Sequence, residues 1–312
     1  MEEEKQIPAR ISAGLPQDVD PGSVSCGRGV AGIFNNPLAT IVRAFPTLDE
    51  SDDIWPVRIH TLGVFSLILN GNPVRFDFEP GRQTLEFLKA LIALGGREVS
   101  SCNLASALWP QADGPVALRL VDESLHALRG TLGEECVLMS PEGGISLVPD
   151  YCWVDVWDFE STVAMTRRIL NGDFTDKDAG RLELLSSRLQ DLYQGHFLTG
   201  EDTTSWSVSL RERLRIRCIQ HLLDIGRYWE SCGLWDKAMP CYQRGLEIDD
   251  LVEDFYQRLM VCCLATSSID EGLAVYRRCR KVLSTVLGLQ PTPETEAVHY
   301  ALMGAIQDKS TA

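Results

Sequence analysis

The sequence lacks any long apolar run, and this absence argues against a membrane-spanning helix. No stretch of about 18 apolar residues occurs anywhere in the 312 residues. The N-terminus, MEEEKQIPAR, is acidic and lacks the apolar segment of a secretory signal peptide. We therefore expect a cytoplasmic protein with no membrane partner.

Paired metal-binding and catalytic motifs are also missing. None of the ten cysteines forms a CxxC pair, and the adjacent Cys262 and Cys263 have poor spacing for zinc. The five histidines lie far apart and form no HExxH pair. No nucleophile–base pair or phosphate loop stands out. The sequence thus predicts free, mostly buried thiols in a reducing cytosol, no metal, no cofactor and no enzymatic activity.

Positive charge is scarce, which counts against binding of nucleic acid. The formal net charge is −15, and the segment 56–160 is the most acidic part, with 7 basic and 14 acidic residues. Affinity for DNA comes largely from neutralisation of phosphates by Lys and Arg. Any proposal of DNA binding has to meet this objection.

Residues 1–55 are expected to form a disordered acidic leader. They are rich in Gly, Pro, Asp and Glu and show no sustained periodicity. Gly27, Gly29 and Gly32 have the GxGxxG spacing of a dinucleotide site. That motif requires a strand before it and a helix after it, and neither pattern is present here. We interpret GRGVAG as a flexible glycine-rich stretch.

Residues 56–155 carry the pattern of a winged helix-turn-helix domain. VRIHTLGVFSLILNG alternates in polarity and ends in an Asn70-Gly71 hairpin turn. Three helical patterns follow: RQTLEFLKALIALGG, then CNLASALW with Ser100 or Ser101 as its cap, then residues 116–132. CVLMS, a PEGG turn and ISLV predict a closing hairpin. A plain α+β domain could share this order.

Residues 156–305 are expected to be all-helical and to contain an internal repeat. GLWDKAMPCYQRG aligns with SSIDEGLAVYRRC 34 residues later, and this is the period of tetratricopeptide repeats. Gly226, Gly233, Ala238 and Gly245 fall where such repeats need small residues. Further helices are expected near 178–194 and 206–231, because about three units are needed for a continuous core. Thr292-Pro293-Glu294 predicts the start of a capping helix through Met303, and residues 306–312 are expected to be a flexible tail.

The fold class expected from these patterns is an α+β winged helix-turn-helix domain followed by an all-α tetratricopeptide-like helical repeat domain. This order resembles activators of the Streptomyces antibiotic regulatory protein (SARP) type, which join a response-regulator-type winged helix to a bacterial transcriptional activation domain. The stretches that carry the resemblance are IHTLGVFSLILNGNPV, ALWPQADG, LHALRGTLG, YQGHFL, RERLR and YRRCRKVLSTVLGLQPTPE. Their order and spacing cover about residues 57 to 305.

The resemblance implies sequence-specific binding of duplex DNA by the third helix of the winged domain, with a wing contact in the minor groove. It also implies contact with RNA polymerase or another regulatory protein through the helical half. A homodimer, or tandem sites, would multiply weak DNA contacts through effective concentration.

The helix at 116–132 is the expected recognition helix. Its spacing places Leu118, Val121, Leu125, Leu128 and Leu132 on the core side. The opposite face carries Val116, Arg119, Leu120, Glu123, His126, Ala127 and Gly130. Relatives commonly have basic residues near the positions of Ala127 and Gly130, and both are uncharged here.

Few side chains are left to contact DNA. Arg119 could bind guanine through O6 and N7, and Glu123 could accept from cytosine N4. Contacts to phosphates or base edges are predicted for His126, Ser124 and Thr131, and Arg129 could swing to a phosphate. The alternative for Arg119 and Arg129 is a solvated charge, or an ion pair with Glu123 or Asp122.

Two functions follow from the sequence. The first is a DNA-binding transcriptional regulator, favoured by the order of domains. The second is a protein-interaction adapter whose acidic winged domain binds DNA weakly or not at all. In that second case Arg211, Arg213, Arg215 and Arg217, or the run Arg277, Arg278, Arg280 and Lys281, could pair with an acidic partner.

Overall fold

The structure is a computed structural model that describes residues 55–74, 79–172, 176–201 and 204–311. All of these residues belong to one compact unit, Pro46–Ala312. The expected disordered leader, with its GRGVAG stretch, lies outside the described residues. No helix in the described part of the chain has the length and apolarity needed to cross a membrane.

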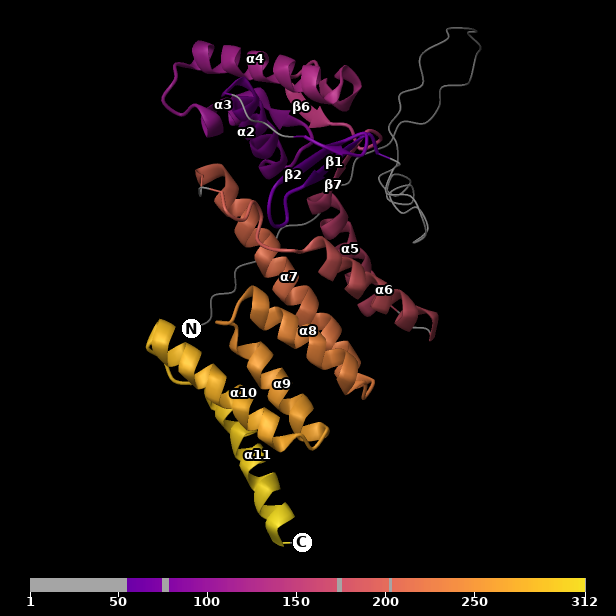
Figure 1. Ribbon diagram of the computed structural model, residues 1–312, viewed down its shortest axis with the longest axis vertical. Coiled ribbons are helices and arrows are strands. Elements are labelled where there is room, and N and C mark those ends of the chain that lie inside the picture. Colours follow the sequence, from indigo (N-terminus) through magenta and orange to yellow (C-terminus); the bar gives the residue numbers. More distant parts are fainter. Residues whose placement is uncertain (1–54, 75–78, 173–175, 202–203, 312) are drawn as a thin grey trace, which may run out of the picture. The chain divides into compact units, whose positions relative to one another are not determined.

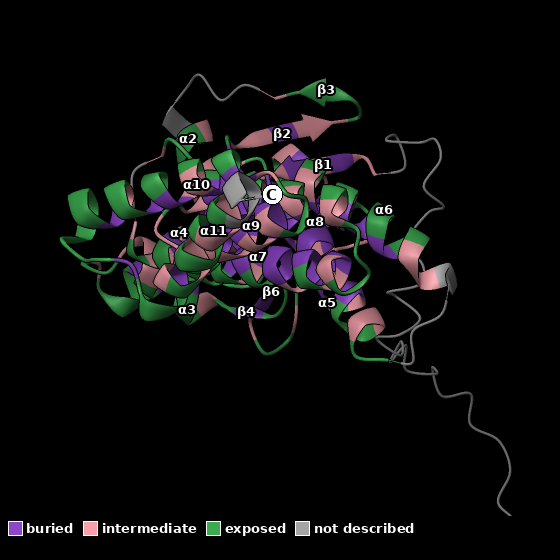
Figure 2. Cartoon of the chain, turned by 90° about the horizontal axis from the view of Figure 1, so that it is seen from below, coloured by how far each residue is buried: buried purple, intermediate pink, exposed green. Residues whose placement is uncertain are grey.

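The first sheet of the winged domain has four strands in the order β3-β2-β1-β7. They are β1 (Val57–His60), β2 (Ser66–Leu69), β3 (Asn72–Pro73) and β7 (Cys152–Val154). The Asn70-Gly71 turn joins β2 to β3, with φ of 48° and 78° at its two residues, as a tight hairpin turn requires. Exposure falls from β3 at the edge to β1 inside the sheet (Figure 2).

Three helices and a second sheet complete this domain. The helices are α2 (Glu79–Ala93), α3 (Ser101–Leu108) and α4 (Gly114–Leu132), and a short turn, η1 (Glu134–Cys136), follows them. The second sheet joins β4 (Val99–Ser100), β6 (Gly144–Leu147) and β5 (Val137–Met139) in that order. Ser100 caps α3 by accepting a hydrogen bond from the backbone N–H of Cys102. The expected winged helix-turn-helix is confirmed, with the β5–β6 hairpin as its wing.

The second half of the chain is a series of helices. They are α5 (Asp155–Leu170), α6 (Asp176–Leu192), α7 (Ser205–Ser231), α8 (Trp235–Ile248), α9 (Glu253–Ala265), α10 (Ile269–Val282) and α11 (Pro293–Thr311), with a π-turn, η2 (Leu283–Leu287), before the last. From α7 onward each helix packs on its neighbour (Figure 1). The boundaries of α8 and α10 are offset by 34 residues at both ends, so the predicted repeat is confirmed.

Glycine has two different roles in these repeats. A Cβ atom at Gly226 or Gly245 would lie under 3 Å from a buried aromatic ring, so both positions allow close helix packing as predicted. Gly233 has nothing within 4 Å of that position, and its φ of +70° marks it as a turn residue between α7 and α8. The packing role expected for Gly233 was therefore wrong.

The last helix is longer than the sequence indicated. It starts at Pro293 as predicted but continues to Thr311, so residues 306–311, which the sequence placed in a flexible tail, are helical. Ala305 and Ile306 pack against the cluster that contains Tyr276 and Leu302. This apolar contact explains why the helix does not stop at Met303.

Asp155 joins the winged domain to the helical half. Its side chain is buried at the start of α5 and accepts hydrogen bonds from the backbone N–H of Thr61, Leu62 and Val156 and from the Thr61 hydroxyl. Burial raises the pKa of this carboxyl to about 6, and the four donors oppose that shift. The end of β1 is thus fixed to the first turn of α5.

The YQGHFL stretch forms a second connection between the two halves. The backbone N–H of Leu198 donates to Thr61 and that of Thr199 donates to Gly63, at 2.8 Å each. Arg211 of the RERLR stretch donates through Nε to the carbonyl of Phe197 at 2.8 Å. Lys89 of α2 adds a partly buried ion pair with Glu201 at 2.6 Å. Two of the motifs that carried the family resemblance therefore build this junction.

A buried histidine in α7 makes the free energy of unfolding depend on pH. His221 is 1% exposed, and within the described residues neither ring nitrogen has a hydrogen-bond partner. Burial, with the nearby Arg167 charge, lowers its pKa from 6.5 to about 4. Above pH 6.5 this histidine is neutral whether folded or unfolded. As pH falls from 6.5 toward 4, the unfolded chain binds the proton more strongly, so the fold should lose about 2–3 kcal/mol.

The loss of unfolding free energy between pH 6.5 and 4 is expected to disappear in His221→Leu. Urea unfolding at several pH values would measure the free energy of unfolding for both proteins, and their difference should change between pH 6.5 and 4. His126→Leu, which removes an exposed histidine of α4, serves as the control and should keep the wild-type pH profile. Parallel profiles for wild type and His221→Leu would contradict the prediction.

Candidate nucleic-acid interface

The local sequence explains where α4 begins and ends. Pro115 lies in its first turn, and Gly133, with a φ of 110°, ends it by donating its N–H to the carbonyl of Arg129. The buried residues are Ala117, Val121, Ser124, Leu125, Leu128 and Leu132. They pack against α2 and α3 and leave the other side of α4 open.

Two residues lie on a different side of α4 from the one expected. Leu118 was expected in the core but is 39% exposed, because the stripe centres on Val121 and Leu128 and includes Ala117 instead. Ser124 was a candidate DNA contact but is 3% exposed. It lies three residues after Val121 and four before Leu128, and this spacing would have indicated a core position. Ser124 is therefore not available to DNA in this structure.

The outward face of α4 holds three of the candidate residues. The side chains of Arg119 and Glu123 are 69% and 61% exposed and form an ion pair of 3.5 Å one turn apart. His126 follows on the same open face and is also exposed. An exposed pair of this kind contributes only about 0.3–0.5 kcal/mol. Arg119 can therefore leave Glu123 at little cost.

Arg129 and Thr131 are used within the domain. Arg129 donates through Nε to the carbonyl of Val137 at 2.9 Å and lies 3.7 Å from Glu134. Thr131 donates its hydroxyl to the carbonyl of Ala127 at 2.9 Å. Arg129 thus connects the end of α4 to the first strand of the wing, so a role in positioning the wing explains it better than a phosphate contact.

The wing tip carries no positive charge. The backbone N–H of Ser140 donates to the carbonyl of Gly144 at 2.8 Å, and Gly143 has a φ of 81° that closes the turn. Pro141 and Glu142 are exposed at the tip. A narrow minor groove attracts Arg or Lys, and this tip presents neither.

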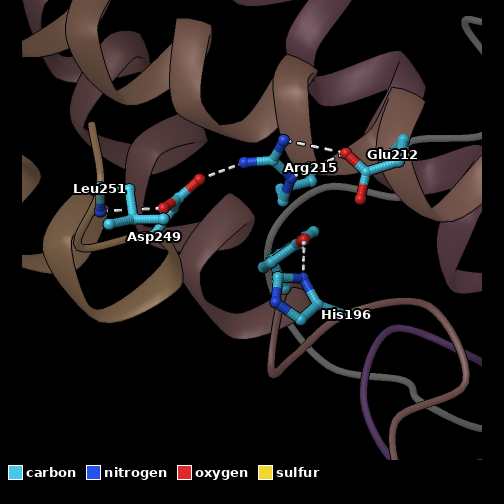
Figure 3. A network of polar contacts seen from close by, with 6 residues as sticks. His196, Glu212, Arg215, Asp249 and Leu251 are labelled. Carbon is cyan, nitrogen blue, oxygen red and sulfur yellow. Dashed lines mark hydrogen bonds and ion pairs between the residues drawn. The ribbon is translucent and has the colours of Figure 1, made fainter. Parts of the chain in front are cut away.

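Four arginines near the start of α7 contact other groups of the protein, namely Arg211, Arg213, Arg215 and Arg217. Arg215 pairs with Glu212 at 2.8 Å on its own helix and with Asp249 at the end of α8, while Asp249 also accepts from the Leu251 N–H (Figure 3). Arg217 and Arg213 both pair with Glu160 of α5. These residues hold helices together and do not form a free basic surface.

The second basic run remains on the surface. Arg277, Arg278, Arg280 and Lys281 are exposed on α10, although Arg278 also lies over the Tyr256 ring at 5.9 Å. Among the described residues, no group of three or more His, Cys, Asp or Glu has a geometry that could hold a metal ion. In the same part of the chain nine cysteines are unbridged, and seven of them are buried.

The model of a known protein family matches the helical half. Residues 154–303 match the bacterial transcriptional activator domain, and this range begins where β7 ends and α5 starts. The helical half is therefore similar in sequence to a bacterial transcriptional activator domain. With the winged helix in front of it, the chain has the domain order of a SARP-type regulator, so the resemblance drawn from the sequence is confirmed.

A solved structure shows the same fold. It is Mycobacterium tuberculosis EmbR in complex with a low-affinity phosphopeptide, which is 19% identical and gives a TM-score of 0.57. The match covers 80% of this chain but only 65% of that chain. A comparison with curated protein sequences gives no match. Since the likeness to EmbR is one of fold alone, the function has to be argued from the residues present here.

Proposed function

We propose that the protein is a transcriptional regulator that binds duplex DNA through the outward face of α4. The observation that carries this proposal is the open face of α4 within a winged helix that directly precedes a bacterial transcriptional activator domain. A helix presented in this way fits the major groove, where each base pair offers a distinct pattern of donors and acceptors.

The proposed base-reading residues are fewer than the sequence indicated. Arg119, Glu123 and His126 stay in the set because their side chains are exposed on one face. Ser124 is excluded from the set because its side chain is buried. Arg129 and Thr131 are excluded because their side chains form hydrogen bonds within the winged domain. Arg119 carries most of the expected specificity, since a bidentate pair with guanine discriminates by about 1–3 kcal/mol.

The acidic winged domain limits how tightly one copy can hold DNA. With few Lys and Arg to neutralise phosphates, the affinity should change less with salt than that of strongly basic regulators. A homodimer on two half-sites would compensate for this through effective concentration. We also propose that the activator domain contacts RNA polymerase or another regulatory protein, which would hold the winged domain near the promoter.

Arg119→Glu is expected to weaken binding to an enriched DNA fragment by about tenfold or more. Fragments would first be selected from genomic DNA of the source organism. Fluorescence anisotropy at about 50 and 200 mM salt would then give the affinities and the salt slope. The matched control is Arg168→Glu, which makes the same charge change at an exposed site on α5. Equal affinities for the two variants would sink the role of Arg119.

The adapter alternative keeps one specific observation in its favour. The two positions of α4 where relatives commonly carry basic residues, Ala127 and Gly130, are exposed and uncharged. A folded protein that bound no fragment at either salt concentration would favour the adapter. The exposed basic run on α10, from Arg277 to Lys281, would then be the first surface to test against acidic partners.

A further inference from the structure

A cleft lies where the winged domain meets the first turn of α7. Its volume is about 540 Å³, which falls in the roughly 300–1,000 Å³ range of small-molecule sites. One wall comes from α2 and the end of α3, and the other from Thr204, Ser205 and Trp206. The start of α7 lies beside α2 (Figure 1). Small-molecule sites occur preferentially at such boundaries between domains.

Two tryptophans give this cleft flat apolar surfaces. Trp109 follows the last turn of α3 and Trp206 lies in the first turn of α7, so they approach the cleft from the two halves of the chain. Both are only partly buried, which leaves ring surface accessible. Indole rings bind other planar rings by stacking or edge contacts. The apolar part of an occupant is therefore expected to be aromatic.

The polar part of the lining favours an anion. Arg82 contributes an exposed guanidinium from α2, and α7 begins at the cleft with the positive end of a 27-residue helix. Thr204 stands at the N-cap position, but its side chain makes no capping hydrogen bond. Its hydroxyl oxygen is shielded from solvent and has no partner among the described residues. Glu86 also lines the cleft, and Lys89, which lies 3.3 Å from it, is shared with Glu201 at 2.6 Å.

We propose that this cleft binds a small planar aromatic anion. The ring would lie against Trp109 and Trp206, and the anionic group would face Arg82 and the first N–H groups of α7. An occupant would touch both halves of the chain and so stabilise their junction. The site is separate from the DNA-facing side of α4, and its ligand binding does not depend on the proposed function.

Anilinonaphthalene sulfonate, an aromatic anion, is a direct probe of this site. It would be titrated into the full chain, with tryptophan excited and energy transfer to the probe recorded. Arg82→Gln is expected to weaken the affinity about tenfold, because a hydrogen bond to a charged group is lost. Phenylnaphthylamine, its uncharged counterpart, should bind wild type and Arg82→Gln equally. Arg168→Gln, a change of the same kind on α5, should leave both affinities unchanged.

A second variant separates this cleft from other apolar surface. Trp206→Leu is expected to weaken both probes severalfold and to reduce energy transfer. If Trp206→Leu leaves binding unchanged, the probe is bound elsewhere, such as at the exposed Val286 and Leu289, and the proposal is overturned. Equal affinity of the anionic probe for wild type and Arg82→Gln overturns it as well. Circular dichroism of each variant would confirm that it is folded.

Discussion

Replacing Asp155 with alanine is expected to reduce the free energy of unfolding by about 3–5 kcal/mol. The carboxylate is 2% exposed and accepts four hydrogen bonds. Alanine would leave three backbone N–H groups and the Thr61 hydroxyl without their partner. Each unsatisfied buried donor costs about 1–3 kcal/mol, and the hydroxyl can turn to another acceptor.

Urea unfolding, followed by tryptophan fluorescence and by circular dichroism, would measure this loss. Asp150→Ala is the matched control, since Asp150 is an exposed carboxylate only five residues away. It should change stability by less than about 0.5 kcal/mol. Asp155→Asn should fall between the two, because an amide keeps one acceptor oxygen but places a donor against the other N–H groups. Equal unfolding midpoints for Asp155→Ala and Asp150→Ala would refute the role of Asp155 in the junction.

The sequence predicted the elements whose signals are local. The Asn70-Gly71 turn, a serine cap at Ser100 or Ser101 and the Pro293 helix start each depend on a few adjacent residues with known backbone preferences, and in the structure the cap is Ser100. The 34-residue repeat was also readable, because two copies could be compared within one chain. Such signals do not depend on contacts between distant residues.

Contacts between distant segments could not be derived in the same way. β7 pairs in parallel with β1, whose residues precede it by about 95 positions, and CWV alone gave no sign of its partner. The backbone hydrogen bonds that join YQGHFL to the loop after β1 could not be predicted from the sequence either. That motif contributed to a family resemblance, but its role in holding the two halves together became clear only from the structure.

The candidate interface could be predicted only in part, because some of its contacts also join segments that lie apart in the sequence. Helical periodicity correctly gave Arg119, Glu123 and His126 an exposed position. It missed the core position of Ser124, because a serine between apolar residues was judged by its polarity. It could not anticipate the bond from Arg129 to Val137, which depends on where the wing returns toward α4.

Gly245→Ala is expected to destabilise the activator domain by about 2 kcal/mol, although alanine is the better helix former. A Cβ at this position of α8 would lie under 3 Å from the ring of Phe255 in α9. Phe255 is 0% exposed, so the ring has no free space to move into. Overpacking of a dense core typically costs about 1–3 kcal/mol, and this severe clash belongs at the upper end. The helix propensity of alanine recovers only about 1 kcal/mol.

The same replacement of glycine by alanine is expected to have the opposite effect on stability at Gly130. Gly130 lies inside α4 with nothing within 4 Å of the added Cβ, so this change should stabilise the protein by up to about 1 kcal/mol. Phe255→Leu combined with Gly245→Ala should cost less than the sum of the two single changes, because the smaller side chain makes room for the methyl group. Urea unfolding of the four variants and wild type would measure both effects. A stabilising Gly245→Ala, or strict additivity in the double variant, would mean that α8 and α9 do not pack as closely as this structure places them.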